Sequence, residues 1–319
     1  MLAAKLRASR DLDLAYTEIA YPLGTAAALG RRVAHWPGKL VVKPTGEDVH
    51  SVPEAVYGFD RYVAPRMLTD WTLRQADAVR CISPLVLEAI ATRTAAMRRV
   101  IPSGVANSTV DEARRDLGVA RADRDRCRRE VAAEFGLGDA KVVLALGRIH
   151  PIKGLEYLVR AMARVRETVL ILAGPSLSVR PHGDHATYLR SIASEEGVSA
   201  RVRFPGYIAH ERVHQILAAA DVLVVPSLLE AMNKVAVEAA SSGTPFVATE
   251  TTGVWKFVRR DGMGRAVPPR DPQARARAIT DILDGGWQFD HDAAREFVMQ
   301  FAPASVTPQL VELFEDTLP

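Results

Sequence analysis

Short apolar runs alternate with longer amphipathic stretches along the second half of the chain. The apolar runs span residues 141–147, 168–174, 201–206, 221–227 and 244–250. Apolar residues at helical spacing occupy residues 154–167, 185–197, 210–220, 233–243 and 272–285. Near-continuous apolar strands are typical of parallel sheets covered on both faces, and parallel strands need right-handed crossovers. The pattern therefore predicts an α/β domain of the doubly wound, Rossmann-like type.

The first half of the chain repeats this pattern with about four strands. Candidate strands span residues 12–17, 39–44, 78–83 and 98–104. A stretch rich in Arg, Asp and Glu, residues 111–137, predicts a solvated linker helix. We expect an acceptor-side domain over residues 1–138, a nucleotide-sugar-binding domain over 139–291, and C-terminal helices over 292–319 that pack back toward the first domain.

Composition and charge narrow the class of protein. Of the 319 residues, 48% are hydrophobic and 25% are charged, as in globular proteins with a real core. The net charge is only +3 and the basic residues are spread out, so we expect no nucleic-acid partner. No apolar run approaches the roughly 18 residues of a membrane-spanning helix, and the first residues are a poor signal peptide. We expect a cytoplasmic protein, at most attached to the inner face of a membrane.

The first stretch with chemical content is Gly-Arg-Ile-His-Pro-Ile-Lys-Gly, residues 147–154, between a predicted strand and a predicted helix. Gly147 permits a sharp turn, and a helix N-terminus offers N–H groups to an anion. Arg148 and Lys153 add two positive charges, which suits a diphosphate. The alternative is that both are surface cations in a turn.

The second stretch, residues 230–238, follows a predicted buried strand and carries two carboxylates eight residues apart. With Glu230 on the loop and Glu238 about a turn into the next helix, both face the crevice at the sheet edge. Carboxylates accept hydrogen bonds from hydroxyls, so the pair suits a sugar and a ribose. The alternative is a helix-start Glu followed by an exposed helical Glu.

Together these stretches resemble the donor-binding half of family 4 glycosyltransferases, whose GT-B fold has two Rossmann-like domains facing across a cleft. The shared motifs are G-R-x4-K-G at 147–154, E-x7-E at 230–238, the small-residue strand entry at 241–248, and segments 204–208, 260–264 and 267–272. The resemblance implies transfer of a sugar from a UDP- or GDP-sugar to an acceptor hydroxyl, with retention of configuration. It also implies a glycan, lipid-linked or small-molecule acceptor and a role in cell-envelope or polysaccharide biosynthesis.

The resemblance assigns roles residue by residue. Arg148 and Lys153 hold the donor diphosphate and stabilise it as it leaves, Glu238 holds the ribose, and Glu230 contacts the transferred sugar at the reacting centre. Gly147 lines the same turn. Tyr207 or Ile208 is expected near the nucleobase, and core or surface packing is the alternative for either residue.

The loop between the two glutamates departs from the family. The N–H groups of Met232, Asn233 and Lys234 are expected to meet sugar hydroxyls or phosphate. Ala231-Met232-Asn233 replaces the common Gly-Phe-Gly, which predicts a narrower sugar pocket.

The acceptor side departs from the family as well. Thr45 stands where the family often has a histidine, in the loop that continues through Gly46, Glu47 and Asp48. Glu47 or Asp48 is a candidate for orienting an acceptor hydroxyl, and a turn-forming Asp is the alternative. Only ten residues precede Asp11, too few for the family's first strand and glycine-rich loop, so we expect an unpaired edge and a poorly filled core in the first sheet. The alternatives are a truncated or misassigned start and a first domain that is built differently.

Several classes of site and function remain to be weighed. The eight histidines and two cysteines show no zinc-type spacing, so we expect no metal and no cofactor, with phosphate charge balanced by Arg148, Lys153 and a helix N-terminus. The rival functions are a degenerate nucleotide-sugar-binding protein and a GT-B sugar-nucleotide epimerase.

A weak attachment to a membrane surface is a further possibility to test. It would use basic residues and a tryptophan near the start of the chain, namely Lys5, Arg7, Arg10, Arg31, Arg32 and Trp36. The alternative is that these residues form an ordinary solvated helix face.

Overall fold

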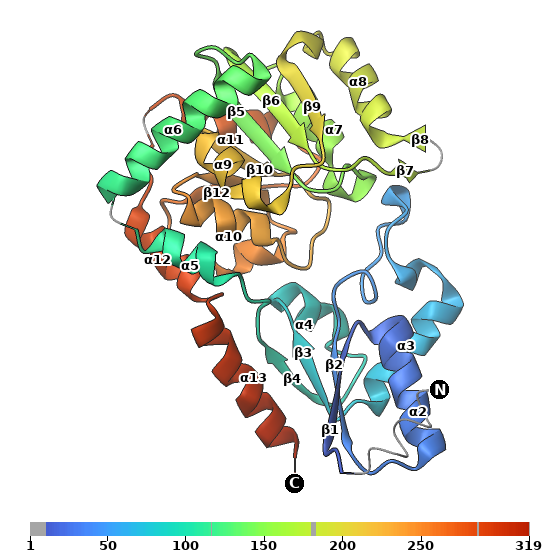
Figure 1. The fold of residues 1–319 in the computed structure, drawn as a ribbon. Helices are drawn as coiled ribbons and strands as arrows, with labels where there is room; N and C mark the ends of the chain where they lie inside the picture. Colours follow the sequence, from blue (N-terminus) through green and yellow to red (C-terminus); the bar gives the residue numbers. More distant parts are fainter. Residues whose placement is uncertain (1–10, 116, 180–182, 286, 319) are drawn as a thin grey trace. The chain divides into compact units, whose positions relative to one another are not determined.

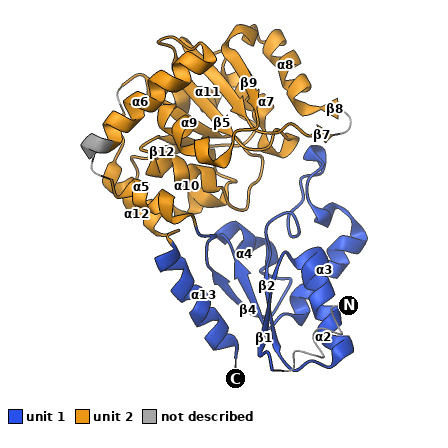
Figure 2. Ribbon diagram, viewed as in Figure 1, with its two compact units in different colours: residues 1–104, 303–319 blue, residues 105–302 orange. Residues whose placement is uncertain are grey.

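The structure is a computed structural model that describes residues 11–115, 117–179, 183–285 and 287–318. The chain divides into two compact units (Figure 2). Unit 1 comprises residues 1–104 and 303–319, and unit 2 comprises residues 105–302.

Unit 1 is built on a parallel four-stranded sheet, which confirms the four predicted strands (Figure 1). The strands are β1 (Leu14–Glu18), β2 (Lys39–Lys43), β3 (Ala78–Cys81) and β4 (Met97–Val100), and they lie in this order. Strand β1 is at one edge of this sheet, and among the described residues nothing pairs with its outer side.

Helices cover this sheet. They are α2 (Thr25–Ala34), α3 (Val63–Gln75), α4 (Pro84–Ile90) and α13 (Pro303–Thr317), with short turns at Ala20–Gly24 (η1), Pro53–Ala55 (η2) and Phe59–Arg61 (η3). Helix α13 contributes Val306 and Leu313 to a small apolar core. The sheet and the residue after β4 contribute Val41, Ala78 and Ile101 to the same core. The end of the chain therefore completes the core of unit 1.

Unit 2 contains a parallel six-stranded sheet. Its strands are β5 (Lys141–Leu146), β6 (Thr168–Ala173), β9 (Val202–Gly206), β10 (Val222–Val225), β11 (Phe246–Thr249) and β12 (Gly264–Val267). They lie in the order β12-β11-β10-β5-β6-β9. A two-stranded ribbon pairs β7 (Ser178–Val179) with β8 (Gly183–Asp184). Five of the six strands were predicted; β12 was not, because it is four residues long and half-polar.

Helices lie on both faces of this sheet, as the doubly wound fold requires (Figure 1). They are α5 (Asn107–Ala113), α6 (Leu117–Phe135), α7 (Leu155–Ala161), α8 (His185–Glu195), α9 (Val213–Ala219), α10 (Lys234–Ser241), α11 (Pro272–Leu283) and α12 (His291–Met299). Short 3-10 turns occur at Pro151–Lys153 (η4), Ser199–Arg201 (η5), His210–Arg212 (η6) and Gly253–Phe257 (η7). Alternate residues of β5 enter two separate apolar layers, one with α7, α8 and α11 and the other with α6, α9, α10 and α12.

The division of the chain differs from the predicted one. The boundary lies at residues 104 and 105 instead of 138 and 139, because α6 packs on unit 2 through the buried side chains Cys127 and Val131. Arg124 of α6 also donates to the carbonyl of Ser242 at 3.0 Å and to the hydroxyl of Thr244 at 2.7 Å. Helix α6 is thus part of unit 2 and no solvated linker. Of the C-terminal helices, α12 belongs to unit 2 and only α13 returns to unit 1.

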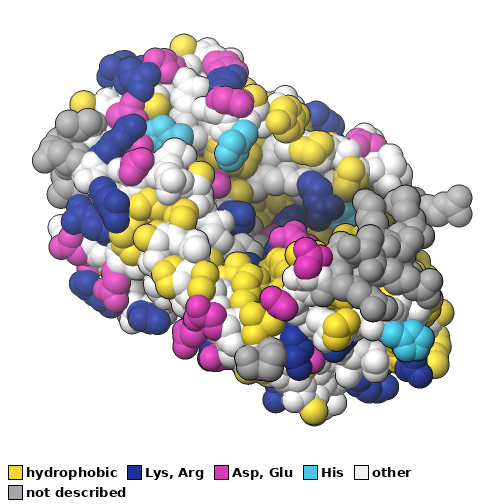
Figure 3. Space-filling view, turned by 60° about the horizontal axis from the view of Figure 1, so that its bottom comes forward, with side chains coloured by type: hydrophobic (Ala, Val, Ile, Leu, Met, Phe, Trp, Pro, Cys, Tyr) yellow, Lys and Arg dark blue, Asp and Glu magenta, His cyan; other side chains and the backbone are white. Residues whose placement is uncertain are grey.

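The residues considered for membrane attachment do not form one exposed face. Trp36 is 4% exposed and Arg31 pairs with Asp77 at 2.6 Å, while Lys5, Arg7 and Arg10 lie outside the described residues. Of the helices in the described ranges, none combines the length and apolarity needed to cross a bilayer. On the face drawn in Figure 3, Lys and Arg side chains are interspersed with Asp and Glu, as their spread along the sequence predicted.

A close backbone approach joins the ends of β5 and β6. Gly174 has φ of 142°, and a Cβ placed on it would lie 1.9 Å from the carbonyl oxygen of Gly147. Only glycine tolerates both the dihedral angle and the contact. This approach fixes the backbone of the turn that carries Gly147.

We predict that Gly174→Ala lowers the free energy of unfolding by about 3 kcal/mol or more, because backbone must move to relieve the clash. Gly197→Ala is the matched control: Gly197 also has positive φ, 69°, but its Cβ would meet nothing within 4 Å. The control should lose only about 1 kcal/mol. Urea denaturation measures both, and equal losses would contradict the described approach.

Candidate functional site

The strand order of unit 2 reverses between β5 and β10. From β5 the chain proceeds outward through β6 to β9, and from β10 it proceeds outward on the other side through β11 to β12. Crossover helices therefore diverge at this point and leave a crevice at the carboxyl ends of β5 and β10. A pocket opens there, with Gly147, Arg148, Lys153, Ser227 and Asn233 among its lining residues.

An ion pair joins the two turns that border this crevice. Lys153, from the turn η4 after β5, donates from Nζ to Oε1 of Glu230 at 2.6 Å. Ser227 donates from Oγ to the other carboxylate oxygen, Oε2, at 2.7 Å. The side chains of Lys153 and Glu230 are only 19% and 15% exposed, so this network is largely shielded from water. Two residues that are 77 positions apart are thus brought together, and their roles toward a donor stay predictions.

The backbone around Glu230 is tied to the next loop. Its N–H donates to the carbonyl of Thr251, and its own carbonyl accepts from Gly253 at 2.7 Å. Thr249 donates from its hydroxyl to the carbonyl of Ser227 at 2.6 Å. These bonds fix the carboxylate's position independently of Lys153.

Arg148 and Gly147 border the same pocket. Arg148 is exposed, and its guanidinium has no ion pair or hydrogen bond with the described part of the chain. Gly147 has φ of 145°, and open space surrounds the position where a Cβ would stand. A ligand can therefore approach the backbone here closely, with one unengaged cation beside it.

Helix α10 begins at the pocket. Asn233 caps it by accepting from the N–H of Ala236 at 2.9 Å, Met232 precedes the cap, and Lys234 is the first residue of the helix. N–H groups at such a terminus lack intrahelical acceptors and favour anions. Asn233 is therefore a cap as well as a pocket residue.

Glu238 lies on the first turns of α10 and is half-buried. Burial raises the pKa of its carboxyl group, and nearby His210 and Lys234 partly oppose this rise. No hydrogen bond to this carboxylate is made by another described side chain, so it is available to a hydroxyl-bearing ligand.

The two candidates for the nucleobase region differ. Tyr207 follows β9 and is 72% exposed, whereas Ile208 packs against the core of unit 2. Ile208 is thus a packing residue, and the role of Tyr207 stays a prediction.

In unit 1 the loop after β2 is held by Asp48. Its Oδ1 accepts from the N–H groups of Thr45 and Gly46, each at 3.0 Å, and its Oδ2 accepts from the N–H of Ala20 at 2.5 Å. Both oxygens are engaged and the residue is fully buried, so Asp48 builds the loop instead of orienting an acceptor. Roles of Thr45, Gly46 and Glu47 toward an acceptor stay predictions.

Sequence reasoning overlooked Ser227 and Thr249 in this site. Ser227 stands three residues before Glu230 in the stretch that follows β10, which was the available signal. Nothing in the sequence indicated that Thr249, at the end of β11, fixes the Ser227 backbone.

Comparison with known proteins matches the part of the chain that contains the crevice. A family model described as "Glycosyl transferases group 1" matches residues 140–285, which contain the whole crevice. D-inositol 3-phosphate glycosyltransferase of Mycobacteroides abscessus is 40% identical over 153 residues, covering 47% of this chain and 34% of that protein. An uncharacterized glycosyltransferase of Methanocaldococcus jannaschii is 29% identical over 194 residues, covering 60% and 46%. The chain therefore spans between a third and a half of these relatives' length.

Solved structures extend the likeness over nearly the whole chain. Sucrose-phosphate synthase from Thermosynechococcus elongatus has a TM-score of 0.78 and 27% identity, covering 98% of this chain and 75% of that one. HepE of Anabaena, solved with UDP, has a TM-score of 0.80 at 21% identity and covers 99% and 82%. Both units thus have the arrangement of strands and helices found in solved GT-B glycosyltransferases, and residues 140–285 of unit 2 are similar to the glycosyl transferases of group 1.

Proposed function

We propose that this protein transfers a sugar from a nucleoside-diphosphate sugar to an acceptor hydroxyl with retention of configuration. The observation that carries the proposal is the pairing of Lys153 with Glu230 at the strand-order reversal, beside the unengaged Arg148. Cations, carboxylate and helix N-terminus converge where open α/β sheets bind ligands. That combination suits a diphosphate joined to a polyhydroxyl sugar.

The proposed chemistry is mainly electrostatic. As the bond from sugar to diphosphate breaks, negative charge grows on the leaving group. Fixed positive groups therefore stabilise the transition state more strongly than the ground state. Arg148 offers a planar pair of donors to phosphate oxygens. Lys153 has three donors, so it can keep its bond to Glu230 and still reach a phosphate. The first N–H groups of α10 add a partial positive charge.

The two glutamates are proposed to hold the donor's hydroxyl-bearing parts. Glu238, without a protein donor, would accept from the ribose hydroxyls. Glu230, fixed by Ser227 and Lys153, would contact the transferred sugar and stabilise positive charge on it. A UDP-sugar is the donor to test first, followed by a GDP-sugar, and the acceptor is a glycan, a lipid-linked compound or a small molecule such as an inositol phosphate.

Measuring the products formed from the donor distinguishes sugar transfer from two rival functions. A non-catalytic nucleotide-sugar-binding protein would bind the donor without releasing the nucleoside diphosphate, and a sugar-nucleotide epimerase would change the sugar without needing an acceptor. The buried Lys153–Glu230–Ser227 network favours transfer, because it places a carboxylate next to the diphosphate cations.

We predict that UDP or GDP raises the melting temperature of the chain, since a ligand that binds only the folded state must stabilise it. Lys153→Ala should weaken nucleotide binding at least about tenfold, because a charge-assisted hydrogen bond contributes roughly 1.5–3 kcal/mol. Lys141→Ala is the matched control, as Lys141 pairs with Asp221 at the surface, outside the pocket. Equal shifts in both variants would contradict the proposed diphosphate site.

Glu230→Gln should separate binding from chemistry. The amide keeps the size of the side chain and loses its charge, so nucleotide binding should change less than about tenfold while turnover falls on the order of a hundredfold. Release of nucleoside diphosphate from the donor is measured with a panel of acceptors. Turnover equal to that of the unaltered protein would exclude Glu230 from the reacting centre.

Glu238→Gln should stabilise the unliganded protein while weakening nucleotide binding. Because burial raises the pKa of Glu238 in the folded state, the stability linked to its protonated form is present below the unfolded-state pKa and is lost as pH rises through the folded pKa. The variant should therefore unfold at higher urea concentration than the unaltered protein at pH 8, with a smaller difference at pH 4.5. Glu195→Gln, at an exposed position of α8, is the control and should change neither quantity. A variant less stable at pH 8 would show that the Glu238 carboxylate has a stabilising partner.

A further inference from the structure

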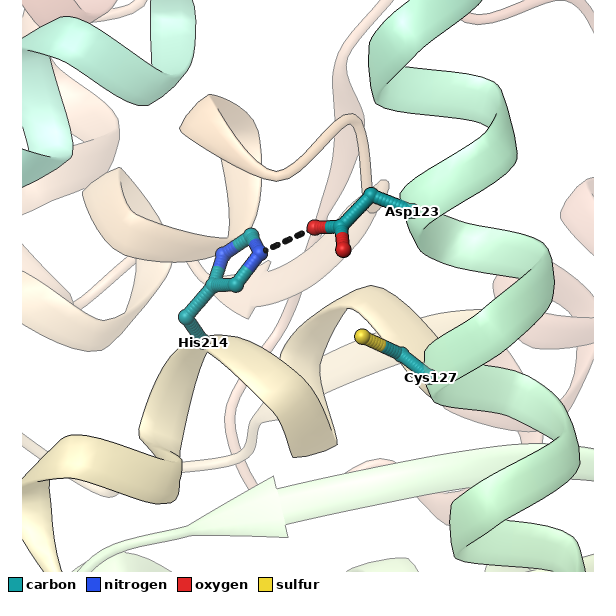
Figure 4. Close-up of side chains that lie close together, drawn as sticks. All are labelled: Asp123, Cys127 and His214. Carbon is teal, nitrogen blue, oxygen red and sulfur yellow. Dashed lines mark hydrogen bonds and ion pairs between the residues drawn. The ribbon is translucent and has the colours of Figure 1, made fainter.

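A second cluster of chemically reactive side chains lies in unit 2, between α6 and α9 (Figure 4). Asp123 and Cys127 project from α6 and His214 from α9, and one ligand atom of each lies within 4.8 Å of the others. None of the three lines the proposed donor pocket. The family motifs used for the donor site do not include them.

The spacing on α6 explains why two of these residues meet the third. Asp123 and Cys127 are four positions apart, so both lie on the helix face that packs against α9. His214 Nε2 lies 2.9 Å from Asp123 Oδ2. A fourth candidate ligand comes from α5, since Glu112 Oε1 lies 3.8 Å from the same nitrogen. Asp123, Cys127 and His214 therefore form one compact cluster, and Glu112 lies beside it next to His214.

The ligand types fit zinc. Thiolate, imidazole and carboxylate are the common ligands of Zn²⁺, at roughly 2.0–2.3 Å from the metal, which places ligand atoms of a tetrahedral site about 3.3–3.8 Å apart. The three ligand atoms lie within 4.8 Å of one another, and His214 Nε2 and Asp123 Oδ2, at 2.9 Å, would have to move slightly apart to admit the metal between them. Asp123, Glu112 and His214 can each adjust by side-chain rotation.

The surroundings also position the histidine. His214 Nδ1 lies 3.1 Å from the hydroxyl oxygen of Ser242, which leaves Nε2 directed at Asp123 and Glu112. Metal-binding histidines almost always have such a hydrogen bond on the nitrogen that does not bind the metal. Ser242 thus performs the usual orienting task.

The local charge accommodates a dication. Asp123 is paired with Arg126 and with Arg115, and Glu112 is paired with Arg115. With Cys127 as a thiolate, three negative groups face these two positive ones, and Zn²⁺ leaves a net charge of about +1. Burial, together with the Asp123 carboxylate, raises the pKa of the Cys127 thiol, so the metal must displace its proton.

A simple ion pair between His214 and Asp123 explains those two residues, and Cys127 packs in the apolar layer under α6, where its sulfur also lies beside the pair. The thiol is 1% exposed and makes no hydrogen bond with the described residues, although it points into the same space. We propose that Asp123, Cys127 and His214, with Glu112 as fourth ligand, form a structural Zn²⁺ site that links α5 and α6 to α9. The site is independent of the proposed function, because it shares no residue with the donor pocket.

Cobalt provides the first test, since Co²⁺ occupies zinc sites and reports on its ligands. The full chain, treated with chelator and dialysed, is titrated with Co²⁺ while absorption is recorded. We expect one equivalent to produce the near-ultraviolet band of a cobalt–thiolate bond together with intense visible bands of tetrahedral geometry. Absence of the thiolate band in the unaltered protein would overturn the proposal without recourse to any variant.

Variants assign the band to the cluster. Cys127→Ala should abolish the thiolate band, and His214→Ala should weaken Zn²⁺ binding at least about tenfold in calorimetry. Cys81→Ala is the matched control, because Cys81 is the other buried free cysteine and lies on β3 of unit 1. His214 is 36% exposed, so its loss should leave the fold intact, which circular dichroism verifies. A band retained in Cys127→Ala, or lost in Cys81→Ala, would contradict the assignment.

Discussion

The reversal of strand order between β5 and β10 is the constraint on which the proposed donor site depends. Parallel strands with right-handed crossovers place every strand-to-helix turn at the same edge of the sheet. At the reversal the crossovers diverge, so the turns after β5 and β10 face each other across open space. Lys153 and Glu230 therefore meet at 2.6 Å, although 77 positions separate them. The glycines at 147 and 174 permit the backbone approach that shapes one wall of this space.

The strands of unit 2 were predictable because parallel sheets buried on both faces demand nearly continuous apolar runs, such as Lys141–Leu146 and Thr168–Ala173. Strand β12 escaped prediction because Gly264 and Arg265 give it no apolar run. Helix α6 was misread for a related reason. Its charged residues dominate the sequence, but its buried face needs only Cys127, Val131 and the buried contacts of Arg124. Charge content alone does not report whether one narrow face of a helix is covered.

In the candidate site, too, the residues within sequence motifs were predictable, whereas those that contribute only through contacts in the folded chain were not. Arg148, Lys153, Glu230 and Glu238 stand in motifs, and the chain around each has the strand, turn and helix that the motifs require. Ser227 and Thr249 contribute through contacts that only the folded chain creates. The cluster of Asp123, Cys127 and His214 is the extreme case, because 91 positions separate Asp123 from His214 and no spacing rule connects them. The expectation of no metal was drawn from spacing alone, and that method cannot detect such a cluster.

The central claim is that the crevice of unit 2 binds the diphosphate of a nucleotide sugar. The most direct measurement is a crystal structure of the chain with the nucleoside diphosphate that stabilises it most. The account predicts the phosphates within hydrogen-bond distance of Lys153 Nζ and the Arg148 guanidinium, with the ribose hydroxyls on Glu238. A nucleotide bound elsewhere, with the Lys153–Glu230 pair unchanged and solvent at Glu238, would contradict it.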